Sequence, residues 1–155
     1  YFVKNTLGFG AKFSQFKTSN TGGTTVINGM SATLAQDITH TFIAPSFSSK
    51  YSTVNQKHHF IFAVGLGYLG YRDDAIVSGA PVKATGATFG SAIDAAYDLS
   101  LTKNFAIGAQ LAFVGGALSK ITYSGPGGKS TVDLEKDEKE SLTRLDISFG
   151  ARFNF

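Results

Sequence analysis

Regular alternation of large apolar side chains with small or polar ones is the feature of this sequence that most limits its fold. It is clearest at the end of the chain, where the odd positions are apolar: Leu145, Ile147, Phe149, Ala151, Phe153 and Phe155. The even positions there include Arg144, Asp146 and Arg152. Successive side chains of a β-strand point to opposite faces, so a period of two residues predicts a strand with one apolar face. The same period runs through the segments that begin near residues 7, 39, 60, 89 and 105.

The size of the side chains indicates which face of these strands points inward. One face is bulky and apolar, and the other carries mainly glycine, alanine and serine with isolated charges. Only 16% of the residues are charged, whereas a water-facing surface carries about 25–35%. Small side chains suit the narrow interior of a small barrel, and bulky apolar ones suit lipid. We therefore expect ten side chains to face lipid: Phe60, Phe62, Val64, Leu66, Ile93, Ile107, Leu111, Leu145, Ile147 and Phe149.

The connections between the strands alternate in length. Counted back from the end, the links 124–140, 73–87 and 19–37 are long, and the links 102–104, 52–57 and 4–5 are short. Outer-membrane barrels have long extracellular loops and short periplasmic turns. No run approaches the roughly 18 apolar residues of a transmembrane helix. The sequence thus predicts an all-β fold, an antiparallel up-and-down transmembrane β-barrel, with full strands at 6–18, 38–51, 58–72, 87–101, 104–122 and 141–155.

The number of predicted strands is too small for a closed barrel. Single-chain bacterial barrels have an even number of strands, about eight or more, and residues 1–3 have room only for the end of another strand. We therefore expect residues 1–155 to be a single barrel domain that lacks one to two N-terminal strands of an eight-stranded protein. A short hairpin of residues 24–27 and 31–35 is an alternative source of strands, but glycines and Asn28 interrupt it.

Several stretches resemble known outer-membrane proteins. The terminal ISFGARFNF resembles the signature that barrel-insertion machinery reads, with Phe149, Ala151, Phe153 and Phe155 at the matching positions. VGLGYLGYRDDA, TFGSAIDAAYDLSLTKNFAIGAQLAF, GALSKI and SLTRLDISFGARFNF resemble the small outer membrane protein β-barrel family that is common in Bacteroidetes. That resemblance implies an eight-stranded barrel shaped like OmpX and the membrane domain of OmpA, in a Gram-negative outer membrane. It implies no catalytic motif.

Charged residues on the inward-facing positions are the first candidate site. Eight of them share this parity: Lys12, Lys50, Asp94, Asp98, Lys120, Arg144, Asp146 and Arg152. Buried charges must be paired or hydrated, and an eight-stranded barrel leaves room only for side chains. We therefore expect an interior charge network formed by Lys12, Asp94, Asp98, Lys120, Arg144, Asp146 and Arg152. An ion-conducting or ligand-binding lumen is the alternative interpretation.

Other chemistry-bearing residues give weaker patterns. His58 and His59 are adjacent, so on a strand they point to opposite faces and are poorly placed to share a metal. Ser46 or Ser48 with His40 is the only candidate for a lipid A deacylase, and these residues share the inward face. The chain has no cysteine, and its close glycines lie inside strands rather than in phosphate-binding loops. The acidic link 124–140 lacks the spacing of a calcium loop. We therefore expect no catalytic residue, metal or cofactor.

The function expected from the sequence is non-enzymatic. The barrel would have a structural or interaction role and present its three long loops outside the cell. Its expected partners are outer-membrane lipid and lipopolysaccharide, the insertion machinery, and a protein at the loops or the barrel wall. No basic run indicates nucleic acid. A narrow pore, a lipid A-modifying enzyme and a soluble ligand-binding barrel remain the alternatives.

Overall fold

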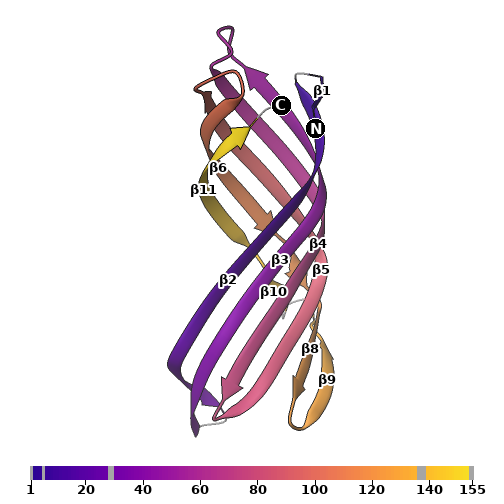
Figure 1. The fold of residues 1–155 in the computed structure, drawn as a ribbon. Coiled ribbons are helices and arrows are strands. Elements are labelled where there is room, and N and C mark those ends of the chain that lie inside the picture. Colours follow the sequence, from indigo (N-terminus) through magenta and orange to yellow (C-terminus); the bar gives the residue numbers. More distant parts are fainter. Residues whose placement is uncertain (1, 5, 28–29, 136–138, 154–155) are drawn as a thin grey trace.

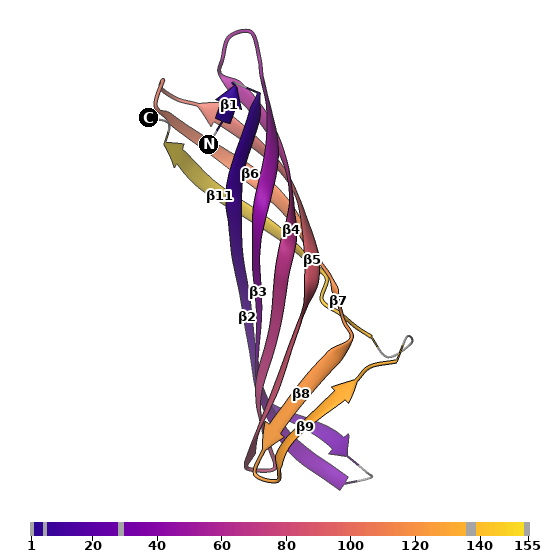
Figure 2. The ribbon, with the colours of Figure 1, turned by 90° about the vertical axis from the view of Figure 1, so that its right-hand side faces the viewer.

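The chain folds almost entirely into antiparallel β-strands. The structure is a computed structural model that describes residues 2–4, 6–27, 30–135 and 139–153. Its main sheet has the order β1-β2-β3-β4-β5-β6-β11 and curls into a half-barrel, with β8 and β9 attached at one end (Figures 1 and 2). The strands are β1 (Phe2–Lys4), β2 (Leu7–Ile27), β3 (Met30–Ser52), β4 (His58–Val77), β5 (Ala80–Ser100), β6 (Phe105–Gly115), β7 (Ala117–Leu118), β8 (Lys120–Gly125), β9 (Gly128–Asp133), β10 (Glu140–Ser141) and β11 (Arg144–Phe153). The prediction of an all-β antiparallel fold is confirmed.

Strand pairing aligns equivalent positions across the whole sheet. Phe13 pairs with Ile43, Ile43 with Tyr68, and Tyr68 with Phe89, so these four residues form one continuous row from β2 to β5. We call it the rim row. Paired residues point to the same face of the sheet, and successive residues of a strand point to opposite faces. Residues two positions apart along a strand therefore belong to successive rows on that face.

Two segments expected to be loops are instead long hairpins. Residues 19–37 continue β2 and β3, with Val26 paired to Ser31, and a register shift between Asn20 and Gly23 absorbs the local glycines. Residues 73–87 continue β4 and β5 up to a tight turn at Ser78 and Gly79, whose φ angles are 49° and 84°. Positive φ at both central residues is the geometry of the two-residue turns that suit hairpins. The strands therefore extend well beyond the predicted limits.

The expected strand 104–122 is also wrong, because the chain bends after Gly115. β6 ends there, and β8 crosses to pair with β5 through Thr122 and Thr85 and with β9 in its own hairpin. β7 and β10 form a separate two-stranded pairing. Part of the link 124–140 is thus ordered as β9 and β10, while residues 136–138 lie outside the described residues.

β1 and β11 lie at the two ends of the strand order. β1 pairs with β2, and β11 pairs with β6. Within the described ranges, no ladder joins β11 to β2, but Arg144 of β11 donates a hydrogen bond to Ser14 of β2 and lies 5.8 Å from the ring centre of Phe16. The additional strands expected before residue 1 stay a prediction.

The apolar core lies on the concave face of the sheet, around the level of the rim row. Its largest fully buried side chains are Phe42, Leu69, Val114 and Leu118, and Leu142 packs with them. Leu118 and Leu142 come from the connection between β6 and β11, which folds over the sheet at this level. No helix in the described part of the chain is long and apolar enough to cross a membrane.

Candidate functional site

The convex face carries a band of large apolar side chains near the short turns. All ten residues expected on the outside are exposed, from 41% for Phe60 to 82% for Phe149. The rim row bounds this band on β2 to β5, with Phe13 67% and Phe89 71% exposed. We call this surface the apolar belt; on β6 and β11 it includes Ile107, Leu111, Phe113, Leu145, Ile147 and Phe149. Phe149, Ala151 and Phe153 of the predicted insertion signal are exposed there, and Phe155 lies outside the described residues.

Behind the belt, the concave face carries ion pairs. Lys12 pairs with Asp94, which also accepts a hydrogen bond from Gln110 at 3.0 Å. Arg152 pairs with Asp98, and Arg144 with Asp146 at 2.8 Å. Asp94 and Asp98 are 7% and 6% exposed, so both are buried carboxylates. Six of the seven residues of the predicted network therefore form pairs on the inward face.

Lys120 is the exception, and its assignment to the network is wrong. It pairs with Asp133 across the β8–β9 hairpin at 2.9 Å, where both side chains are largely exposed. The prediction counted parity along a strand continuous from residue 104. The bend after Gly115 interrupts that count, so Ile121 is buried and Lys120 points outward.

A glycine lets one of the buried carboxylates fit. A Cβ atom on Gly108 of β6 would lie 2.2 Å from Asp98 Oδ1 and 2.4 Å from the carbonyl oxygen of Tyr97. No side chain fits at such distances. The small residues of the inward face therefore leave room for the charged side chains of neighbouring strands.

The three histidines have three different surroundings. His40 packs against the rings of Phe16 and Tyr71, rather than against the serines considered for a deacylase. His58 bonds to the hydroxyl of Tyr97 on the convex face, at 2.7 Å. His59 lies on the concave face, with its two ring nitrogens at 2.7 Å from Ser52 Oγ and 2.9 Å from Ser100 Oγ. The described residues contain no group of three metal-ligating side chains.

A buried polar group that the sequence analysis missed lies beyond the rim row. Asp73 is 8% exposed; its Oδ2 accepts hydrogen bonds from Gln36 and Tyr71. Burial, together with the negative charge of Asp73, raises the pKa of Tyr71 to about 12. The tyrosine hydroxyl therefore stays protonated and donates to the carboxylate. No sequence signal marked Asp73, because it lies in the segment taken for a loop.

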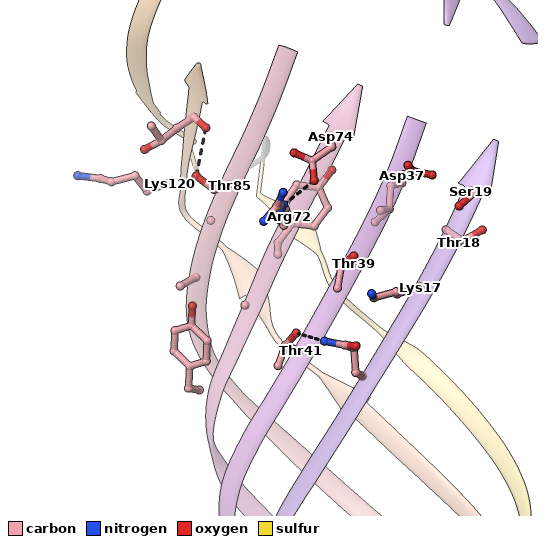
Figure 3. Close-up of a pocket in the computed structure, with 18 residues that line it drawn as sticks. Lys17, Thr18, Ser19, Asp37, Thr39, Thr41, Arg72, Asp74, Thr85 and Lys120 are labelled. Atoms are coloured by element: carbon pink, nitrogen blue, oxygen red, sulfur yellow. Dashed lines mark hydrogen bonds and ion pairs between the residues drawn. The ribbon is translucent and has the colours of Figure 1, made fainter. Parts of the chain in front are cut away.

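An open groove lies on the convex face immediately beyond the rim row. It encloses about 1020 Å³ (Figure 3). Two rows of paired residues define it: Gln15–Thr41–Gly70–Ala87, and then Lys17–Thr39–Arg72–Thr85–Thr122. Ser19, Asp37 and Asp74 form the row above. We call this surface the polar groove.

The charged side chains of the polar groove only partly neutralise one another. Arg72 and Lys83 both pair with Asp74, the latter at 3.6 Å. The hydrogen bond from Arg72 holds the pKa of Asp74 below its ordinary value, so this carboxylate is ionised at neutral pH. No ion pair of Lys17 is found within the described residues, although Lys17 lines the same groove. These residues went unnoticed in the sequence because their proximity depends on strand register.

No family model, curated protein or solved structure matches this chain. The resemblance to outer-membrane barrels therefore depends on the sequence patterns alone.

Proposed function

We propose that this chain is a non-enzymatic, integral β-barrel protein of the Gram-negative outer membrane, with a structural or interaction role. One observation carries the proposal: the convex face changes from apolar to polar at a single row of residues. On β4 the outward side chains are Phe60, Phe62, Val64, Leu66 and Tyr68, and then Gly70, Arg72 and Asp74. The neighbouring strands change at the same row.

The exposed apolar area of the belt is larger than is usual for a surface in water. Soluble monomers rarely expose contiguous apolar patches larger than a few hundred Å². The belt continues across β2, β3, β4, β5, β6 and β11, and its aromatic and aliphatic side chains are mostly more than 40% exposed. Lipid chains are an environment in which such a surface is stable and in which added charge is costly. The sharp boundary at the rim row then corresponds to the edge of the hydrocarbon layer.

The height of the belt fits a bilayer. On β3 it runs from Ile43 to Tyr51, which is about 26 Å along the strand at 3.3 Å per residue. On β5 it runs from Phe89 to Leu99, or about 33 Å. At a strand tilt of about 40°, these lengths span about 20 and 25 Å, and the apolar band of membrane barrels is about 25 Å tall.

The extended hairpins are the part of the molecule that would meet other molecules. β2–β3, β4–β5 and β8–β9 project beyond the rim row, at the end opposite the short turns (Figures 1 and 2). With the short turns in the periplasm, these hairpins stand outside the cell. The core of Phe42, Leu69 and Leu118 on the concave face supports a sealed barrel rather than a pore.

Insertion into lipid is the direct test of this proposal. The chain is refolded from urea in the presence of phosphatidylcholine vesicles and, as a control, in buffer without lipid or detergent. We expect heat-modifiable migration on a detergent gel and protection of the belt strands from protease only with vesicles. A soluble, protease-resistant fold in buffer alone, with no association with vesicles, would show that the proposed function is wrong.

A further inference from the structure

We propose that the polar groove binds the phosphorylated sugar headgroup of an outer-leaflet lipid, a phosphorylated glucosamine disaccharide of the lipid A class. Lys17, Arg72 and Lys120 all line this groove immediately beyond the apolar rim row. This inference depends on the proposed function, because it assigns the groove to the headgroup level of the outer leaflet.

Three cationic side chains of the polar groove are placed to contact an anionic ligand. Lys17 on β2, Arg72 on β4 and Lys120 on β8 line one groove, to which five strands contribute (Figure 3). Lys120 is on the convex face beside Ala87, since the β5–β8 register pairs Thr85 with Thr122. Three cations from distant parts of the sequence thus line one groove, together with the two carboxylates of Asp37 and Asp74.

The existing ion pairs of the groove can be replaced by pairs with a bound phosphate. The pair of Lys120 with Asp133 is 59% and 77% exposed, and that of Arg72 with Asp74 is 55% and 40% exposed. Exposed pairs of this kind contribute only about 0–1 kcal/mol. Charge-assisted hydrogen bonds to phosphate are stronger, at about 1.5–3 kcal/mol each. A phosphate group can therefore recruit these cations without a large loss of internal stability.

Hydroxyl groups line the same two rows. Thr39 and Thr85 flank Arg72 in one row, and Thr41 and Thr122 line the same groove. Thr41 accepts a hydrogen bond from Gln15 at 3.4 Å, and Thr122 shares one with Thr131 at 3.0 Å. Hydroxyl groups can donate to phosphate oxygens and can also bond to sugar hydroxyls. The lining thus suits a phosphorylated sugar better than a bare apolar ligand.

The position of the groove indicates that its ligand is a lipid. The groove adjoins the rim row, where Tyr68 lines it and Phe13, Ile43 and Phe89 are 67%, 50% and 71% exposed. Tyr68 of the same row lies over Gly70, so a Cβ on that glycine would be 2.9 Å from the tyrosine hydroxyl oxygen. Its hydroxyl thus reaches the polar groove while its ring belongs to the belt, as is common for tyrosines at membrane interfaces. A molecule with phosphates at one end and acyl chains at the other would fill both surfaces.

The test compares lipid binding by two variants with the same change in net charge. In Lys17→Gln/Lys120→Gln, two cations of the groove are removed. In the control, Lys57→Gln/Lys103→Gln, two exposed lysines are removed at the short-turn end. Each protein is refolded in detergent and titrated with diphosphorylated lipid A or with the same lipid after dephosphorylation. Bound lipid is counted by native mass spectrometry.

We expect the diphosphorylated lipid to bind the unmodified protein more tightly than the dephosphorylated one. The groove variant should lose this preference by roughly tenfold or more, the equivalent of about 1.4 kcal/mol, while the control variant keeps it. Equal binding of the two lipids would overturn the inference. So would an equal loss in both variants, or displacement of the lipid by inorganic phosphate at the same concentration.

Failure of this site and failure of the proposed function give different results. Insertion is measured first, in vesicles of phosphatidylcholine without any phosphorylated sugar lipid. A chain that does not insert contradicts the membrane proposal itself. A chain that inserts and migrates in a heat-modifiable manner, but shows no preference for the diphosphorylated lipid, contradicts only the site in the polar groove.

Discussion

The two ends of the four long strands have opposite polarity. Near the short turns, β2 to β5 present an apolar convex face and a concave face with buried ion pairs such as Lys12–Asp94. Beyond the rim row the convex face carries Lys17, Arg72 and Asp74, while the apolar core packs on the concave face around the level of that row. The exposed face of the sheet is therefore apolar at one end and polar at the other.

The comparison shows that side-chain alternation alone does not reveal which face is outside. The period of two residues continues unchanged through the rim row, and at that row the convex face changes from mainly apolar to mainly polar. A soluble sheet would keep one assignment along its whole length, because water surrounds both ends. A change of solvent along the strand is the simplest physical cause of this change in the convex face.

The largest effect is expected at the belt end, inside the half-barrel. Asp94→Ala leaves the Lys12 ammonium group without its partner among largely buried side chains. Removal of one member of a buried pair costs about 3–5 kcal/mol, because the remaining charge is uncompensated. We expect this loss in the free energy of unfolding, measured by urea titration of the protein in lipid vesicles.

The exposed pair of the opposite end is the matched control for this substitution. Asp133→Ala removes the partner of Lys120 in the β8–β9 hairpin, where both side chains are exposed. Exposed pairs contribute about 0–1 kcal/mol. A similar loss for both variants would mean that the concave face is open to water and that its charges are not desolvated.

The next effect is expected in the apolar core at the level of the rim row. Leu118 is fully buried, and Leu118→Ala leaves a cavity between Phe42, Leu69 and Val114. Such substitutions cost about 2–5 kcal/mol. Leu111 on the belt is 45% exposed, and lipid chains can close around the smaller side chain of Leu111→Ala. The same urea titration should therefore give a clearly larger loss for Leu118→Ala, and equal losses would contradict the division into core and belt.

A third comparison places the same charge on two positions of β4. Val64 in the belt and Ile76 beyond the rim row lie on the same face and are each 51% exposed. Val64→Arg should reduce the stability of the inserted protein by about 2–4 kcal/mol, the cost of arginine near the middle of a bilayer. Ile76→Arg should change it by no more than about 0.5 kcal/mol, as at an ordinary surface position. Equal losses of stability for the two variants in vesicles would mean that both positions have the same surroundings, and the distinction between the two ends would be wrong.

The strands and their faces could be predicted because they depend on local alternation. The ten outward side chains and six of the seven network charges follow from parity alone. The extended hairpins could not, because Gly22, Gly23 and Gly79 read as loop signals, whereas the structure uses them at a register shift and a turn. Parity also fails for Lys120 after the bend at Gly115. The polar groove requires the register between five strands, which no single segment contains.

The smallest effect concerns the turn that makes one of these extensions possible. Gly79 has a φ of 84° at the tip of the β4–β5 hairpin, and nothing lies within 4 Å of the position of an added Cβ. Gly79→Ala should therefore act through backbone strain rather than crowding, at about 1 kcal/mol. Gly127→Ala, in the β8–β9 turn, is the control, since its surroundings are equally open and its φ is not in the positive range. Because the turn is remote from the belt, we expect faster amide hydrogen exchange in residues 73–85 of the Gly79 variant and unchanged exchange in residues 60–68. If both regions exchange faster together, the extension and the belt unfold as one unit, and the two ends differ in their surroundings but not in their stability.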